Sequence, residues 1–178
     1  MTHDGESIDG EVINAAVQTV LAEIPEGEPR PDCVFEYCFQ GVLRQKTARL
    51  AALVAEHGSA KNILSYLAYS GHFIAVVIAP QARLLMWADS LERYAVSARQ
   101  TELDNLAAAC QVVYGADSAQ QFGTLRVECP QQPPESNICA IETANNLLEM
   151  AGVRLQNGRF TRATMEHLLR RIWAAYVK

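Results

Sequence analysis

Three residues far apart in the chain could together perform nucleophilic catalysis: His72, Asp89 and Cys139. Cys139 follows a proline-rich stretch and opens a segment whose apolar residues recur at helical spacing, so we expect its thiol at a helix N-terminus. The unpaired N–H groups and the positive end of the helix dipole there favour an anion, and therefore a thiolate nucleophile. From this stretch alone, the commoner interpretation is a small buried cysteine without a chemical role.

Two glutamines, Gln131 and Gln132, lie a few residues before Cys139 and add side-chain amide donors. A thiolate beside an amide donor is half of an acyl-transfer site, because the amide can stabilise the negative charge that develops on a carbonyl oxygen.

The overall composition is that of an ordinary globular protein. The 178 residues, 49% of them hydrophobic and 20% charged, fit one domain over residues 1–178. The net charge of −5 and the lack of an arginine- or lysine-rich run argue against nucleic acid as the main partner. No apolar segment approaches the length of a membrane span, and the polar, acidic residues 1–9 do not resemble a secretory signal. We therefore expect no membrane partner and an intracellular location.

The cysteines indicate free thiols in a reducing compartment. They are odd in number, at positions 33, 38, 110, 129 and 139. Cys33 and Cys38 are close in sequence, but no second pair follows, so we expect neither a structural zinc nor any cofactor.

Hydrophobic periodicity predicts the elements that must position these residues. We expect helices over 8–21, 43–57, 101–113, 139–151 and 161–177, and strands over 62–69, 73–79, 84–87 and 125–129. Residues 33–39 fit either a strand or a short helix. Asp9 is a plausible N-cap of the first helix, and Trp173 and Tyr176 fall on the predicted buried face of the last. Helices around a small sheet give an α+β domain.

The two central strands predict that His72 and Asp89 meet. His72 precedes one strand, Asp89 follows the next, and a short turn joins the two strands, so both residues fall at the same end of the sheet. The carboxylate can then hold the imidazole in one tautomer while the other ring nitrogen faces a thiol. The remaining histidines, at positions 3, 57 and 167, lack a matching acid. We expect the charged residues of 91–100 to form a solvated face rather than a rim of the site.

Four blocks of the sequence resemble the catalytic domain of the ubiquitin-like-protein-specific cysteine proteases, the SUMO (sentrin) proteases. The blocks are Glu11-Val12-Ile13-Asn14, Gly71-His72-Phe73, Trp87-Ala88-Asp89-Ser90-Leu91, and Cys129-Pro130-Gln131-Gln132 followed by Cys139. The order His, Asp, Gln, Cys and the 17 positions from His72 to Asp89 match the family. The resemblance covers nearly the whole chain and implies a papain-like or adenain-like fold, with a small central mixed sheet flanked by helices.

The resemblance also implies an activity. It implies a monomeric cysteine isopeptidase or endopeptidase that cleaves after the C-terminal glycine of SUMO, ubiquitin or another ubiquitin-like modifier. Cys139 would be the nucleophile, His72 its base, Asp89 the residue that orients His72, and Gln132, or else Gln131, the oxyanion donor. Such an enzyme would act in the cytoplasm or nucleus, or as a secreted effector inside a host cell.

The chain departs from the family pattern around the nucleophile and the substrate tail. Ile138 replaces an aspartate, Ala140 replaces a glycine, and Ser7 and Phe73 replace two tryptophans that in the family hold the Gly-Gly tail. These departures keep open a pseudoprotease that only binds a ubiquitin-like protein. Acyl transfer to another nucleophile and a peptidase for short peptides are further alternatives. The expected substrate-binding residues are Phe73, Trp87, Gln131 and Asn137.

Overall fold

The computed structural model describes residues 4–115, 121–133, 136–155 and 158–176. Its helices are α1 (Asp4–Ala22), α2 (Leu43–His57), α3 (Val96–Gly115), α4 (Cys139–Met150) and α5 (Arg162–Tyr176). Its strands are β1 (Cys33–Phe35), β2 (Asn62–Tyr69), β3 (His72–Ala79), β4 (Leu84–Ala88) and β5 (Gly123–Arg126).

The strands form one mixed sheet in the order β1-β2-β3-β4-β5. The central strands β2, β3 and β4 are antiparallel, whereas β1 pairs with β2 and β5 pairs with β4 in parallel. All eight residues of β3 are buried, as expected for an uninterrupted apolar run at the centre of a sheet that is covered on both faces.

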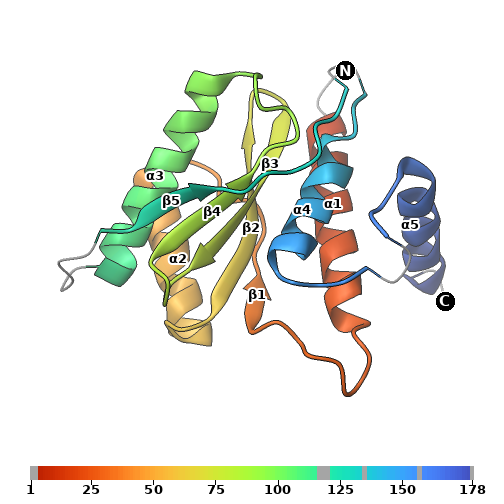
Figure 1. Cartoon of the computed structure of the whole chain (residues 1–178), viewed down its shortest axis with the longest axis horizontal. Helices are drawn as coiled ribbons and strands as arrows, with labels where there is room; N and C mark the ends of the chain where they lie inside the picture. Colours follow the sequence, from red (N-terminus) through yellow and green to blue (C-terminus); the bar gives the residue numbers. More distant parts are fainter. Residues whose placement is uncertain (1–3, 116–120, 134–135, 156–157, 177–178) are drawn as a thin grey trace.

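Helices cover the two faces of the sheet and create two cores. Helices α2 and α3 lie on one side, and α1 and α4 lie on the other, with α5 packed outside α1 (Figure 1). Side chains alternate along β3, so Phe73, Ala75 and Val77 join the α1/α4 core while Ile74, Val76 and Ile78 join the α2/α3 core. His72, the first residue of β3, therefore lies at the end of the strand, just before the residues that enter the two cores.

Most predicted elements are confirmed, and the differences have physical causes. The helix over 43–57 and the strand over 62–69 match as predicted, and Gly58 ends the helix with a positive φ of 88°. Residues 33–35 form a strand, and the strand predicted over 125–129 is instead Gly123–Arg126. Asp9 is not the N-cap, because α1 begins at Asp4, one polar turn before the apolar stripe.

The last helix buries a narrower face than predicted. Met165 and Leu168 are buried, but Trp173 is 73% exposed, so its assignment to the core face is wrong. The helix rests mainly on α1, and that contact covers only a thin stripe. The side chain of Tyr176 lies outside the described residues.

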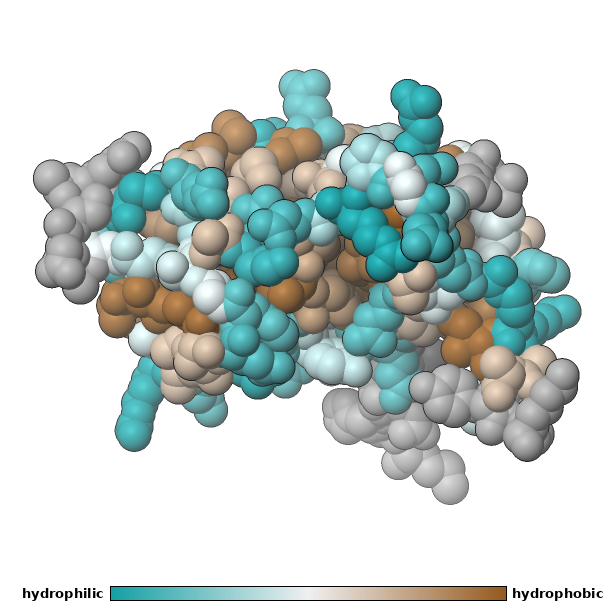
Figure 2. Space-filling model, turned by 90° about the horizontal axis from the view of Figure 1, so that it is seen from below, coloured by the Kyte–Doolittle hydropathy of each residue, from teal (hydrophilic) through white to brown (hydrophobic). Residues whose placement is uncertain are grey.

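Neither the surface shown in Figure 2 nor the described helices have the character of a membrane-spanning segment. On the face shown in Figure 2, hydrophobic residues form several separate patches among hydrophilic side chains. Among the helices that the structure describes, none is both long and apolar enough to cross a bilayer.

Candidate active site

A tight hairpin places His72. Tyr69 and His72 are paired across β2 and β3, which leaves Ser70 and Gly71 as a two-residue loop with positive φ angles of 47° and 73°. Such turns follow the natural twist of the strands and favour glycine at the second position. The His72 ring is 3% exposed and makes edge-on contacts with Tyr69 and Tyr94, at centroid distances of 5.5 and 5.8 Å.

Asp89 leaves β4 beside His72, as predicted from the strand order. The His72 Nε2–H donates to Oδ1 of Asp89 over 2.8 Å, and both side chains are buried. Oδ1 also accepts the backbone N–H of Leu91 (2.8 Å), while Oδ2 accepts the hydroxyl of Tyr69 (2.9 Å) and Nη1 of Arg99 (2.6 Å). Burial alone would raise the pKa of Asp89, but the hydrogen bonds from His72, Arg99 and Leu91 outweigh it and lower the pKa to about 2. Asp89 is thus an ionised carboxylate with four donors.

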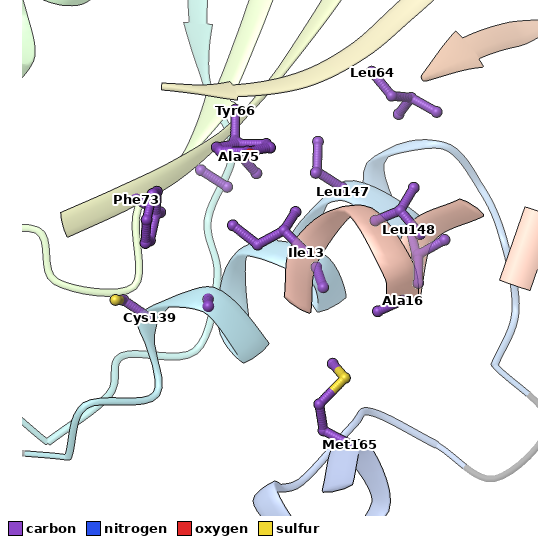
Figure 3. Packing of buried hydrophobic residues seen from close by; sticks show 14 of the residues in the cluster. Ile13, Ala16, Leu64, Tyr66, Phe73, Ala75, Cys139, Leu147, Leu148 and Met165 are labelled. Atoms are coloured by element: carbon purple, nitrogen blue, oxygen red, sulfur yellow. The ribbon is translucent and has the colours of Figure 1, made fainter. Parts of the chain in front are cut away.

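Cys139 is the first residue of α4, as the helical periodicity predicted. Figure 3 shows its sulfur at the end of the helix, directed away from Ile13 and Leu147. Ile138 occupies the N-cap position and has no side-chain group that could cap the first N–H groups of the helix. Within the described residues, no side chain caps this helix, so the positive end of α4 lies next to the thiol, with the carboxylate of Glu142 in the first turn.

One buried hydrogen bond joins the helix of Cys139 to the strand of His72. The hydroxyl of Thr143, one turn into α4, donates to the backbone carbonyl of Phe73 over 3.1 Å. This contact fixes the start of α4 against the start of β3.

The pKa of His72 reflects both of its predicted partners. Burial lowers this pKa, but the hydrogen bond with Asp89 and the nearby Cys139 outweigh burial and raise the pKa to about 9. Because Asp89 takes Nε2, the remaining ring nitrogen, Nδ1, is the one available to the thiol. A raised imidazole pKa favours a histidine that can hold the proton of the cysteine.

The two glutamines have different partners. Both ends of the Gln131 side-chain amide are hydrogen-bonded within the protein. Its Oε1 accepts the backbone N–H of Glu92 (3.0 Å), and its Nε2 donates to the carbonyl of Asp89 (2.9 Å). Gln132 is buried, and its Oε1 accepts the hydroxyl of Ser90 over 2.7 Å. Among the described residues, Nε2 of Gln132 has no hydrogen-bond acceptor, so Gln132, the donor preferred from the sequence, is the glutamine with an amide end available to a substrate.

The structure does not favour the predicted substrate contacts. Phe73 is 5% exposed and packs edge-on against Tyr66 in the α1/α4 core, so no open ring face is available for a substrate tail. The guanidinium groups of Arg99 and Arg126 lie over the ring of Trp87, at 5.0 and 5.9 Å from its centroid. The ring of Trp87 is thus already in contact with two side chains of this protein. Gln131, as described above, braces the loop after β4.

Asn137 is exposed and has a different local role from the one predicted. It takes a positive φ of 47°, a conformation that asparagine tolerates better than most residues, and so turns the chain into α4. Ser7, the other tail-binding position of the family, has a side chain outside the described residues.

Arg99 was missed from the sequence. We expected a solvated charged face over 91–100, but Arg99 is buried and donates from Nη1 to Asp89 and to the carbonyl of Glu92. The expectation was wrong for this residue because the packing of α3 against the sheet, which the local pattern does not encode, brings Arg99 to the acid. Tyr69 and Ser90 were also missed; an aromatic before the hairpin and a serine after the acid were the only signals.

Within the described residues, no cluster of three or more His, Cys, Asp or Glu side chains could hold a metal ion. A cavity of about 820 Å³ lies at the far end of α4, lined by residues that include Val153, Leu168 and Arg171. Cys139 begins the same helix, so the length of α4 lies between this cavity and the candidate site.

Comparison with known proteins identifies the fold. No family model matches the sequence, and no curated protein is similar to it. Solved structures do match. The C-terminal Ulp1 protease domain in complex with Smt3, the yeast orthologue of SUMO, is 16% identical with a TM-score of 0.53, over 83% of this chain and 67% of that one.

Two further matches agree. SUMO protease Ulp1 with its catalytic cysteine oxidised to a sulfonic acid is 15% identical with a TM-score of 0.54, over 89% of this chain and 72% of that one. The Ulp1-like SUMO protease catalytic domain of Chaetomium thermophilum is 16% identical with a TM-score of 0.51, over 83% of this chain and 62% of that one. The predicted fold is confirmed: this chain has the α+β fold of the SUMO protease catalytic domains.

Proposed function

We propose that this protein is a cysteine protease that cleaves after the C-terminal glycine of a ubiquitin-like modifier. The observation that carries the proposal is the buried His72–Asp89 pair, together with the effect of Cys139, at the start of α4, on the pKa of the same histidine. An imidazole between a fixed carboxylate and a thiol is the arrangement that nucleophilic acyl transfer requires.

Before the substrate reacts, the proton of Cys139 Sγ is transferred to Nδ1 of His72, which leaves a thiolate beside an imidazolium. The thiolate attacks the carbonyl carbon of the terminal glycine, and the carbonyl oxygen becomes an oxyanion held by the Gln132 side-chain amide and the backbone N–H of Cys139. When this intermediate collapses, the C–N bond breaks, and His72 gives its proton to the departing amine. The products are the free amine and a thioester between the modifier and Cys139.

In the second half, water attacks the thioester carbonyl while His72 accepts a proton from it. The C–S bond breaks, His72 returns its proton to the Cys139 sulfur, and the modifier leaves as a carboxylic acid that loses its own proton to solvent. Asp89 remains ionised throughout, because its four donors stabilise the charge, and it holds Nε2 so that Nδ1 keeps facing the sulfur.

The comparisons support SUMO as the first modifier to test. A protein of the same fold was solved in complex with Smt3, the yeast orthologue of SUMO. Ubiquitin is the second modifier to test, because a free C-terminal glycine is common to both.

The experiment uses SUMO and ubiquitin that carry an electrophile at the C-terminus. We expect wild type to form a covalent adduct with at least one of them, and Cys139→Ala to form none. Cys129→Ala is the matched control, since Cys129 is a partly exposed thiol in the same loop that should not be needed. Adducts that persist in Cys139→Ala would contradict the assigned nucleophile. Modifier binding without any adduct in wild type would instead support the pseudoprotease, which the burial of Phe73 favours.

A further inference from the structure

We infer that Ser90 is a positioning residue that fixes which end of the Gln132 amide faces the reacting carbonyl. The inference rests on the proposed function and extends it to a residue that does not touch the substrate.

Ser90 and Gln132 are joined by two hydrogen bonds, one between their side chains and one between their backbones. The Ser90 hydroxyl donates to Oε1 of Gln132 over 2.7 Å, and the backbone N–H of Gln132 donates to the carbonyl of Ser90 over 2.8 Å. Both residues are buried, so the side-chain bond is protected from exchange with water.

The side-chain bond matters because a primary amide has two chemically opposite ends. The NH₂ end stabilises an oxyanion, whereas the carbonyl end repels it, and the two ends exchange by a half-turn of the terminal torsion. A hydroxyl that donates to Oε1 holds the carbonyl end away from the site. It thereby leaves the NH₂ end for the substrate.

The backbone around this pair is itself braced, so the hydroxyl has a fixed position. Ser90 directly follows Asp89, and Gln131 bridges the carbonyl of Asp89 to the N–H of Glu92. The two carboxylate oxygens of Glu92 accept hydrogen bonds from Nη1 and Nη2 of Arg126, over 2.7 and 2.6 Å. The segment 89–92 and the segment 131–132 therefore behave as one unit, and the same unit carries the acid and the oxyanion donor.

The inference predicts a distinctive kinetic effect for Ser90→Ala. The oxyanion exists in the transition state and not in bound substrate, so kcat should fall while KM stays near the wild-type value. Loss of a whole oxyanion donor costs about 10²–10³ in rate, and we expect Ser90→Ala to lose ~10-fold or more, up to that limit. Ser90→Thr keeps the hydroxyl and should recover most of the activity.

The experiment measures hydrolysis of SUMO and ubiquitin C-terminal fluorogenic amides by wild type, Ser90→Ala, Gln132→Ala and the double variant. If Ser90 acts through Gln132, Ser90→Ala has no further effect once Gln132 is alanine. The matched control is Ser65→Ala, which also removes a 2.7 Å bond from the hydroxyl of a buried serine, to the carbonyl of Tyr37, but on β2 away from the site. It should alter stability without altering kcat.

A second measurement separates orientation of the amide from damage to the nucleophile. Alkylation of Cys139 by iodoacetamide forms no oxyanion, so its rate should be unchanged in Ser90→Ala. Full hydrolysis by Ser90→Ala, additive losses in the double variant, or slowed alkylation would each overturn the inference about Ser90 alone. A wild-type chain that neither hydrolyses the amides nor alkylates faster at Cys139 than at Cys129 would overturn the proposed function, and this inference with it.

Discussion

The two halves of the candidate site are held by different forces. The acid half is a polar network: Asp89 accepts four hydrogen bonds, and one of its donors, Arg99, comes from the opposite side of the sheet to α4. The nucleophile half is mostly apolar: Cys139 belongs to the α1/α4 core, and the polar link from its helix to β3 is the hydroxyl of Thr143.

The difference shows how one site can be both fixed and adaptable. A buried carboxylate needs several donors to remain ionised, so its position is set within narrow limits. Apolar packing sets the position of a helix less strictly, because dispersion contacts have little directionality. We infer that the acid half provides the reference geometry, and that α4 brings the sulfur to it.

We expect the largest loss of stability when Arg99, a donor to Asp89 in the polar half, is replaced. Arg99→Met leaves Asp89 buried with one cation fewer, and removal of one partner of a buried ion pair typically costs about 3–5 kcal/mol. Urea unfolding at pH 7 measures this cost. Because the hydrogen bond from Arg99 helps to lower the pKa of Asp89, turnover by the variant should also fail at a higher pH on acidification.

Arg83→Met is the control for Arg99. Arg83 likewise lies over an aromatic ring, Phe122, and hydrogen-bonds a backbone carbonyl, but at the other end of the sheet. It should lower stability without moving the acid limit of activity. An Arg99→Met variant with wild-type stability would contradict this prediction, because it would show that the three remaining donors are enough to stabilise the Asp89 carboxylate.

A smaller effect is expected from titration of His72. Its pKa rises from 6.5 to about 9 on folding, so the histidine contributes stability fully below pH 6.5, and this contribution is lost as the pH rises through 9. At about 1.4 kcal/mol per pKa unit, the loss is on the order of 3 kcal/mol. The free energy of unfolding, measured by urea titration between pH 6 and 10, should fall for wild type and stay flatter for His72→Gln.

His57→Gln serves as the control for that titration, since His57 ends α2 away from the site. The variant should keep the wild-type slope between pH 6 and 10. Parallel slopes for wild type and His72→Gln would contradict a protonated, paired His72.

The sequence predicted the parts of the site that depend on neighbouring elements. His72 and Asp89 could be paired because two antiparallel strands with a short connection must bring the start of one beside the end of the next. Cys139 could be placed at a helix start because the apolar period begins directly after it. Both inferences need only local geometry.

The residues that escaped prediction depend on distant packing. Arg99 looked like a solvated charge because it shares the segment 91–100 with the charged residues Glu92 and Arg93, and only the approach of α3 to the sheet buries it. Phe73 looked available to substrate, but strand alternation turns it into the α1/α4 core against Tyr66, whereas His72, one residue earlier, stays at the end of the sheet. Trp173 looked buried because helical periodicity cannot tell how wide a stripe the neighbouring helix covers.

The smallest effect is expected from Thr143, where the nucleophile half has its polar link. Thr143→Val keeps the branched shape and removes the hydroxyl that donates to the carbonyl of Phe73, at a cost of about 1 kcal/mol in unfolding free energy. If this bond only stabilises the fold, kcat stays at the wild-type value. If it also sets the distance from the sulfur to His72, kcat and the iodoacetamide rate of Cys139 fall together, by a few-fold. Thr101→Val is the control, because the exposed Thr101 makes a comparable bond within α3, to the carbonyl of Ser97. We expect kcat and the iodoacetamide rate to fall together for Thr143→Val only. Without the hydroxyl, apolar packing alone lets the start of α4 shift by a fraction of an ångström, and proton transfer between the sulfur and His72 is sensitive to such a shift.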